Sequence, residues 1–260
     1  MGNGDDETKF RKLRRFNAVM GVFHFIQFLL MLVLSNDFAL PLTRSYLVYN
    51  NATMSLELAK TTVADIPIGP LVGIFLLMSA IAHFSNASPW GYPWYVKNLK
   101  KGINYARWYE YAASSSVMIV VISMLVGIYD IGILLPCFVI NAIMNFCGLL
   151  MELHNQTTEK TNWTAYYIGC LAGIVPWLVI GIYFAGASEA AAGSIPDFVL
   201  YIYISIAFFF NIFAINMVLQ YKKVGPWRDY LYGERFYVIL SLVAKTLLAW
   251  QVFVGTLRPV

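Results

Sequence analysis

Hydrophobic residues gather in long runs along this chain, and polar and charged residues stand mainly between the runs. A helix needs about 20 apolar residues to cross a hydrocarbon core of about 30 Å. Seven runs reach that length, which predicts an all-α membrane protein, a seven-transmembrane-helix bundle in one domain over residues 1–260. The predicted spans are 16–35, 66–88, 105–128, 131–152, 164–186, 197–221 and 236–257.

One connection between the runs is much longer than the others. Residues 36–65 contain two β-prone stretches, 46–49 and 53–58, separated by Asn50-Asn51, and this pattern is typical of two strands about a turn. Long loops in compact bundles are usually functional or form an interaction surface. We expect a short antiparallel β-hairpin that either contacts the second subunit of a homodimer or only caps the bundle.

The charges predict how the chain is oriented in the membrane. Although 59% of the residues are hydrophobic, the chain has eighteen Lys and Arg residues. Fourteen of them lie in the N-terminal tail, in the second, fourth and sixth connections, or at the adjoining span ends. The positive-inside rule places the tail 1–15 in the cytoplasm and both the 36–65 loop and the C-terminus outside the cell membrane. Because these charges flank spans, we expect contact with membrane lipids and no nucleic-acid partner.

Two charged residues interrupt the apolar pattern deep within spans. Lys245 lies near the middle of 236–257, and Glu110 is the only acidic residue well inside a span. A charge at this depth costs about 2.5–3.5 kcal/mol on insertion scales and usually has a function. Counted at about 1.5 Å per residue, both residues fall in the cytoplasmic half. Helical side chains tilt toward the N-terminus of their helix, so the Lys245 amine should point toward Glu110.

A buried lysine permits several interpretations. An ion pair that orders the bundle is one, although such pairs stabilise poorly for their desolvation cost. The amine can instead form a Schiff base with an aldehyde. One lysine in the last span, one acid in the third and an interior rich in aromatic residues and Met are together typical of a retinal pocket. An enzyme acting on a lipid aldehyde is a rival from another class, but the outer half offers no second acid or base, so we expect no enzyme. The three cysteines have no metal-site spacing, and we expect no metal.

Six short segments carry a more specific signal, because they occur together and in one order. They are 21–24 (GVFH), 36–41 (NDFALP), 107–111 (RWYEY), 114–120 (SSSVMIV), 173–177 (GIVPW) and 241–245 (SLVAK). With these segments the chain resembles the heliorhodopsins, inverted-topology microbial retinal-binding rhodopsins, over about 16–257. The resemblance implies a light-sensing photoreceptor with a slow signalling photocycle, no ion pumping and an unidentified cytoplasmic signalling partner.

Carried over by position, the resemblance also implies the roles of individual residues. All-trans retinal would be bound to Lys245 as a protonated Schiff base, with Glu110 as counterion and Ser241 hydrogen-bonding near the linkage. The other residues implied at the retinal are Ser114, Met144, Gly148, Trp177 and Phe210. A polar, water-holding cavity on the cytoplasmic side would be formed by His24, Gln27, Ser79, His83, Arg107 and Tyr111.

The third and last spans depart from the pattern of ion-pumping rhodopsins. Those pumps carry further acids or hydroxyl groups beyond the counterion, where this chain has Ser114 and Val121, and an Asp four residues before the lysine, where it has Ser241. A relay that needs a second buried carboxylate on the outer half is therefore not expected. A light-gated or light-driven proton conductor remains the alternative, because a histidine-containing cavity would permit it.

Overall fold

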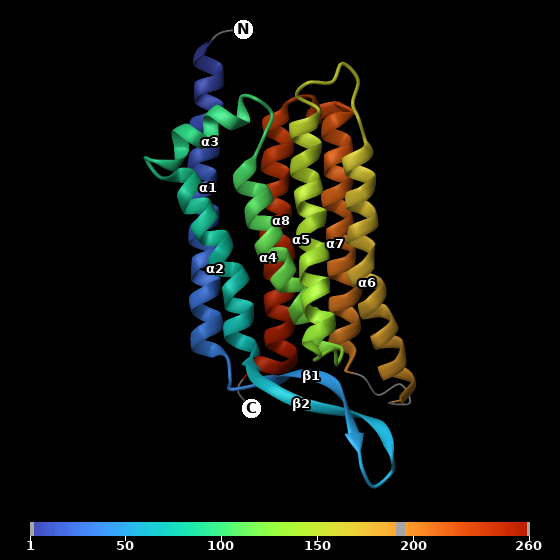
Figure 1. Cartoon of the computed structure of the whole chain (residues 1–260). Coiled ribbons are helices and arrows are strands. Elements are labelled where there is room, and N and C mark those ends of the chain that lie inside the picture. The colour runs from blue at the N-terminus through green and yellow to red at the C-terminus, as the bar shows by residue number, and fades with distance from the viewer. Residues whose placement is uncertain (1–2, 191–195, 259–260) are drawn as a thin grey trace.

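The computed structural model describes residues 3–190 and 196–258. Within these residues, seven helices are long and apolar enough to cross a membrane, and they stand side by side in one bundle (Figure 1). The predicted seven-helix fold is thus confirmed. The seven helices are α1 (Asn3–Leu34), α2 (Ile68–Ala87), α4 (Tyr105–Leu125), α5 (Ile131–His154), α6 (Thr164–Ala190), α7 (Asp197–Tyr221) and α8 (Tyr230–Val252), and α8 continues as a π-helical turn, Phe253–Leu257.

Helix ends at the N-terminal side of the bundle differ from the predicted spans. The helix α1 begins at Asn3, well before the predicted start near residue 16, because Phe10 and Leu13 pack with Tyr95 and Leu231 and continue the helix through the charged tail. Tyr95 belongs to a short helix, α3 (Gly91–Leu99), in the connection that follows α2. Charged residues at a helix end lower the local hydropathy without ending the helix, so apolar runs mark the membrane core better than the helix ends.

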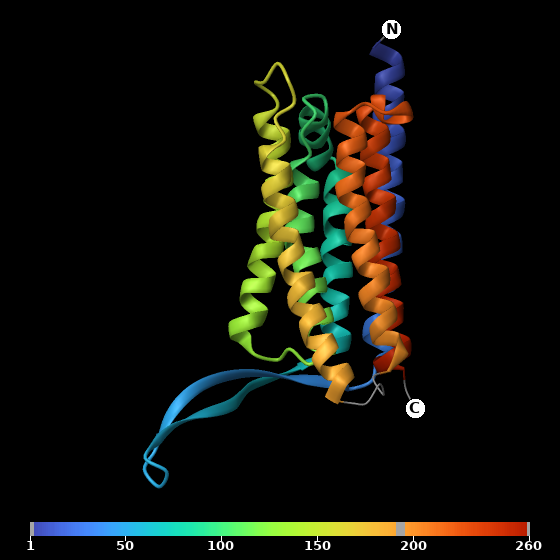
Figure 2. The same ribbon diagram turned by 90° about the vertical axis from the view of Figure 1, so that its right-hand side faces the viewer.

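The long connection forms the predicted antiparallel ribbon, and it is longer than the sequence indicated. Strand β1 (Ala39–Asn50) pairs with β2 (Ser55–Pro67), with Leu47 opposite Leu58 and a register shift between Leu42 and Thr43. The ribbon crosses the end of the bundle at which the C-terminus lies and then extends past it (Figure 2). Its base is held to the bundle by the backbone N–H of Thr43, which donates to the carbonyl of Tyr129 at 2.8 Å.

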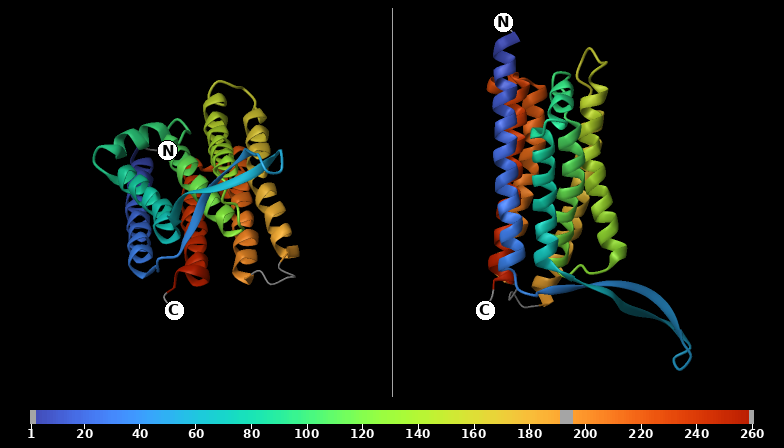
Figure 3. Two further views of the ribbon diagram at one scale, coloured as in Figure 1. Left: turned by 60° about the horizontal axis from the view of Figure 1, so that its bottom comes forward. Right: turned by 90° about the vertical axis from the view of Figure 1, so that its left-hand side faces the viewer.

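Helix α8 lies against α1, α2 and α7, and the remaining neighbours pack in chain order from α1 to α2, α4, α5 and α6 (Figure 3). The largest buried apolar cluster fills the half of the bundle near the ribbon and includes Val72, Ile122 and Leu248. Buried polar side chains are concentrated in the other half, toward the N-terminal end. The fold therefore joins an apolar half to a polar half, and Lys245 stands near the junction.

Candidate functional site

The Lys245 amine is held by three side chains from three helices. Its Nζ donates to Glu110 Oε1 on α4 at 2.6 Å, to Ser79 Oγ on α2 at 2.6 Å, and to Ser241 Oγ at 3.0 Å. Ser79 Oγ also lies 2.6 Å from Glu110 Oε1, so one carboxylate oxygen accepts from both groups. Ser241 reaches the amine because it lies one helical turn before Lys245 on the same face of α8. The structure thus brings together the lysine and the acid that the sequence singled out.

Burial explains why these groups must contact one another. The Lys245 side chain is 4% exposed and that of Glu110 is 8% exposed. A charge taken out of water is costly unless it is paired and hydrogen-bonded. Tyr111 adds an aromatic face, with its ring centroid 5.3 Å from Nζ. The site can therefore hold one positive charge on the nitrogen, balanced by one carboxylate.

A mainly apolar cavity begins at the Lys245 amine and runs between α4, α5, α6, α7 and α8. Trp108 and Tyr237 form its wall toward the N-terminal end, and Tyr166 and Cys170 contribute from α6. The predicted retinal-site residues that line this cavity are Ser114, Met144, Gly148, Phe210 and Ser241, and Tyr111, predicted for the polar cavity, lines it too.

Trp177 is placed differently from the other predicted retinal-site residues. It does not line this cavity; its ring packs against Phe210, with centroids 5.3 Å apart, and against Tyr203. It therefore supports the wall from behind.

The cavity has the features that an elongated apolar aldehyde requires. Gly148 leaves room that a side chain would take, because a Cβ there would overlap the ring of Trp108. Ser114 Oγ is buried and has no hydrogen-bond partner in the described protein. Pockets for small molecules are typically apolar with a few convergent polar groups. An amine beside a carboxylate at one end of an apolar space fits retinal in these respects.

The predicted polar cavity residues do not form one group. His24 and His83 stack with ring centroids 5.5 Å apart, and His83 Nδ1 lies 2.8 Å from Asn17 Oδ1. Both ring nitrogens of His24 are buried without a hydrogen-bond partner among the described residues. Gln27 instead accepts from Trp250 Nε1 at 3.2 Å. The histidine pair lies on the α1–α2 side, and a water-filled cavity around it stays a prediction.

Arg107 belongs to a separate cluster that the sequence did not reveal. Its guanidinium pairs with Glu152 of α5 and with Glu234 of α8, and all three side chains are at least 96% buried. Glu234 was not expected in the interior, because it precedes the predicted span 236–257 and Glu110 was the only acidic residue expected well inside a span. The spacing of residues could have predicted that Glu234 faces the interior. It lies seven residues before Ser241 and eleven before Lys245, and is therefore on the same helical face.

Comparisons with known proteins agree with this fold. The heliorhodopsin family model matches residues 13–257. A search of curated proteins gave no match. Among solved structures, the fold is similar to that of a light-driven proton pump, LR (Mac), from Leptosphaeria maculans, with a TM-score of 0.64, 14% identity, and coverage of 98% of this chain and 96% of that one. At that identity the likeness shows the fold alone. Because the family match covers nearly the whole sequence, the chain belongs to the heliorhodopsin family, a group of multi-pass membrane proteins of the retinal photoreceptor kind.

Proposed function

We propose that this protein is a light sensor that holds all-trans retinal on Lys245 and signals without transporting ions. The observation that carries the proposal is the position of Lys245 Nζ, 2.6 Å from the Glu110 carboxylate at one end of the apolar cavity. When bound, retinal would supply a polyene that absorbs visible light and changes shape by isomerisation.

The side chains around the amine have distinct roles in this proposal. Glu110 balances the positive charge on the nitrogen of residue 245, which would otherwise be buried and unpaired. The Ser79 and Ser241 hydroxyl groups orient the nitrogen, since both lie within 3.0 Å of it. Trp108 and Phe210 restrict the space along the cavity and keep water away from the polyene.

The distribution of buried acids supports a function without pumping. In the part of the chain that the structure describes, the buried carboxylates are Glu110, Glu152 and Glu234, and all three lie between Lys245 and the N-terminal end. Toward the ribbon the amine faces an apolar cluster that contains Ile122 and Leu248. A proton that leaves the nitrogen therefore has buried carboxylates as acceptors on one side only, among the described residues. Net proton transport needs acceptors on both sides of the nitrogen. The observed distribution therefore favours transient release and return of the proton.

One observation favours proton conduction as the second candidate function. His24 and His83 lie side by side near the site, and the two nitrogens of His24 have no hydrogen-bond partner among the described residues. Imidazoles with free nitrogens can pass protons. Photocurrents measured by patch clamp under illumination would support this alternative, and their absence would support the sensor.

We further propose that the protein is a homodimer and that its N-terminus lies in the cytoplasm. The ribbon supports the homodimer. With the N-terminus inside, the ribbon lies outside the cell. One of its faces carries Leu47, Tyr49, Leu56 and Leu58, which are 50–72% exposed. An exposed apolar patch of this kind marks an interaction site, and a second subunit would cover it. The signalling partner would then bind at the opposite, cytoplasmic end.

Expression with added all-trans retinal tests the sensor proposal. We expect a visible absorption band that disappears in Lys245→Ala and remains in Lys222→Ala, which changes an exposed lysine. Under illumination, vesicles or cells should show no sustained pH change that a protonophore abolishes. Colourless wild-type protein would overturn the retinal assignment, and a sustained protonophore-sensitive pH change would overturn the absence of pumping.

A further inference from the structure

A second, polar cavity lies at the N-terminal end of the bundle, apart from the Lys245 cavity. It opens between the α5–α6 and α7–α8 connections, where Glu159, Lys223 and Arg228 of its lining are exposed. Its inner lining includes Glu152, Gln220 and Tyr230. Of the residues that the structure describes, none lines both cavities. The structure must therefore contain a barrier between them.

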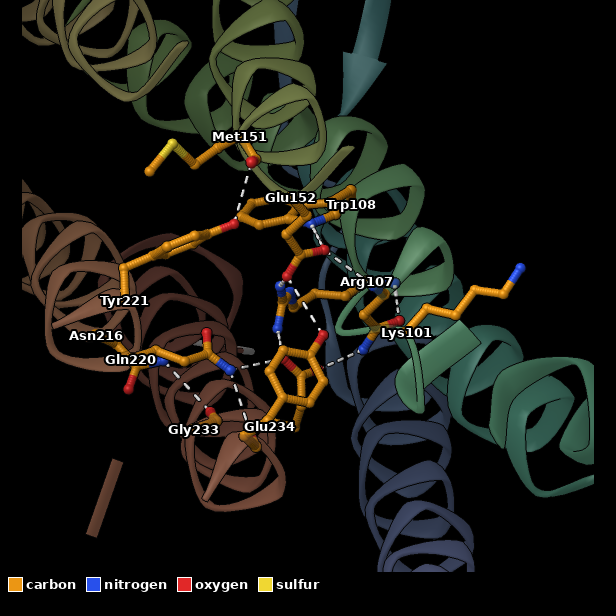
Figure 4. Close-up of polar contacts among 12 residues, drawn as sticks. Lys101, Arg107, Trp108, Met151, Glu152, Asn216, Gln220, Tyr221, Gly233 and Glu234 are labelled. Carbon is orange, nitrogen blue, oxygen red and sulfur yellow. Dashed lines mark hydrogen bonds and ion pairs between the residues drawn. The ribbon is translucent and has the colours of Figure 1, made fainter. Parts of the chain in front are cut away.

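The cluster of Arg107, Glu152 and Glu234, whose polar contacts are drawn in Figure 4, lies between the linings of the two cavities. On one side, Glu152 borders the polar cavity. On the other side, the Arg107 guanidinium carbon lies 4.4 Å from the ring centroid of Trp108 and 4.0 Å from that of Tyr237. These two rings line the Lys245 cavity and meet edge to face, with centroids 6.2 Å apart. The ion pairs and the two rings together lie between the two cavities.

The order of residues along α8 agrees with such a barrier. Tyr230 borders the polar cavity, Glu234 lies in the cluster, Tyr237 lies in the aromatic wall, and Ser241 and Lys245 lie in the site. Each step is one helical turn of three or four residues. The eleven residues from Glu234 to Lys245 correspond to about 16 Å along the helix. One face of a single helix therefore connects the N-terminal end to the amine.

Protein groups satisfy the carboxylates of the cluster without water. Glu152 Oε1 accepts from Arg107, and Oε2 accepts from the Asn104 backbone N–H at 2.9 Å and from Trp108 Nε1 at 2.7 Å. Glu234 Oε1 also accepts from Arg107, and Oε2 accepts from Asn104 Nδ2 at 2.6 Å. Each of the four oxygens thus has a protein donor, whereas Arg107 Nε is buried without a hydrogen-bond partner among the described residues.

We propose that Arg107, Glu152 and Glu234 form a charged plug that closes a water route from the N-terminal end to the Lys245 cavity. This route runs between α4, α5, α7 and α8 and is separate from the histidine pair on the α1–α2 side. The guanidinium is the essential member, because it bridges two carboxylates and separates their like charges. Without it, two buried carboxylates face each other unpaired and must draw in water. Without one carboxylate, a neutral Arg–Glu pair remains and the plug stays closed.

The plug can be tested without retinal. The three native cysteines are replaced by alanine, and Ser114→Cys places a thiol in the wall of the Lys245 cavity. Protein in phospholipid nanodiscs is exposed to Ag⁺, which comes from water and not from lipid. After denaturation, the thiols that have not reacted are counted with a maleimide. The measured quantity is the rate at which Ag⁺ reaches residue 114.

The charge balance of the cluster predicts how the variants rank by the rate at which Ag⁺ reaches residue 114. Arg107→Gln should raise the rate by about tenfold or more, because two unpaired carboxylates hydrate the barrier. Glu234→Gln should leave the rate within about twofold of the parent, because a balanced pair remains. Asn216→Ala removes a buried, uncharged polar side chain beside the barrier; it is the matched control and should also leave the rate unchanged. If Arg107→Gln does not fold, Tyr237→Ala instead removes one of the two rings of the aromatic wall and should accelerate the reaction.

Three results would overturn the plug. They are an unchanged rate when the guanidinium or the aromatic wall is removed, an equal acceleration in Asn216→Ala, and an equal acceleration in Glu234→Gln. The inference rests on the proposed function only in taking the Lys245 cavity as the retinal pocket. Protein that reacts as predicted with Ag⁺ but forms no pigment would contradict the retinal assignment and leave the plug standing. Protein that forms pigment but whose plug variants react with Ag⁺ at the parent rate would support the retinal assignment and contradict the plug.

Discussion

Replacing Glu110 by Gln removes the charge that faces Lys245 and changes little else. The two side chains have almost the same volume, and the amide can still accept from Ser79. The nitrogen of residue 245 lies 2.6 Å from Oε1, and both partners are nearly buried. The substitution therefore isolates the electrostatic contribution of one carboxylate to keeping the nitrogen positively charged.

The size of this contribution follows from the geometry. At an effective dielectric constant of about 20, unit charges 2.6 Å apart attract by about 6 kcal/mol. Breaking a buried pair typically costs about 3–5 kcal/mol. The hydroxyl groups of Ser79 and Ser241 remain in Glu110→Gln, so we take the lower figure of about 3 kcal/mol. At about 1.4 kcal/mol for each factor of ten, the ratio of protonated to unprotonated linkage nitrogen should fall about a hundredfold at a given pH.

Absorption spectroscopy of pigment at neutral pH measures this ratio. The protonated linkage absorbs visible light and the unprotonated one absorbs in the near ultraviolet, so Glu110→Gln should move intensity from the first band to the second. Glu110→Asp keeps the charge and should retain the visible band. Glu152→Gln removes a different buried carboxylate and should also retain it. A visible band in Glu110→Gln with wild-type position and titration would refute the assignment of Glu110 as counterion.

Three further perturbations test the cavity, the ribbon and a helix cap. Gly148→Val should reduce the yield of pigment by about tenfold or more, because its side chain would overlap the indole ring in the cavity wall, whereas Gly186→Val, with open space around it, should not. Leu58→Lys should convert dimers to monomers in native mass spectrometry, whereas Val48→Lys, on the other face of the ribbon, should not. The Ser45 hydroxyl and the Gly132 N–H lower the pKa of Asp130, the N-cap of α5. A carboxyl group with a lowered pKa stabilises the fold at pH values above its ordinary pKa of 3.8. This stabilisation is lost as the pH falls through the lowered pKa of the folded protein. Asp130→Ala should therefore lower the melting temperature more at neutral pH than near pH 2, and equal losses at both would contradict this.

The seven spans and the Lys245–Glu110 pair could be predicted because each depends on a property of one segment. A run of about 20 apolar residues must lie in the membrane wherever its neighbours stand. The one lysine and the one acid that lie well inside predicted spans, at similar depth, must pair, because either alone would be too costly. The tilt of helical side chains toward the N-terminus gave the direction of the amine. These inferences needed no knowledge of helix packing.

The helix ends and the cluster at Arg107 could not be obtained in this way. Glu234 lies in a polar stretch before the last apolar run, and hydropathy does not distinguish a solvated loop from a helical turn that is covered by other helices. Its burial depends on Arg107, which is 127 residues away, and on Gln220 of α7. The family resemblance implied Arg107 in the polar cavity with the histidines, whereas the structure places it with two carboxylates on another side of the bundle.

The sequence by itself determined that the chain spans the membrane seven times, that the long connection forms a ribbon, and that Lys245 and Glu110 face each other. Those features follow from hydropathy, alternation and the cost of burying single charges. Only the tertiary structure decided that Trp177 stands behind Phe210, that the histidines stack on the α1–α2 side, and that Arg107 joins Glu152 and Glu234. Partners of this second kind come from helices far apart in the chain, and the way those helices pack, not the local sequence, sets which side chains meet.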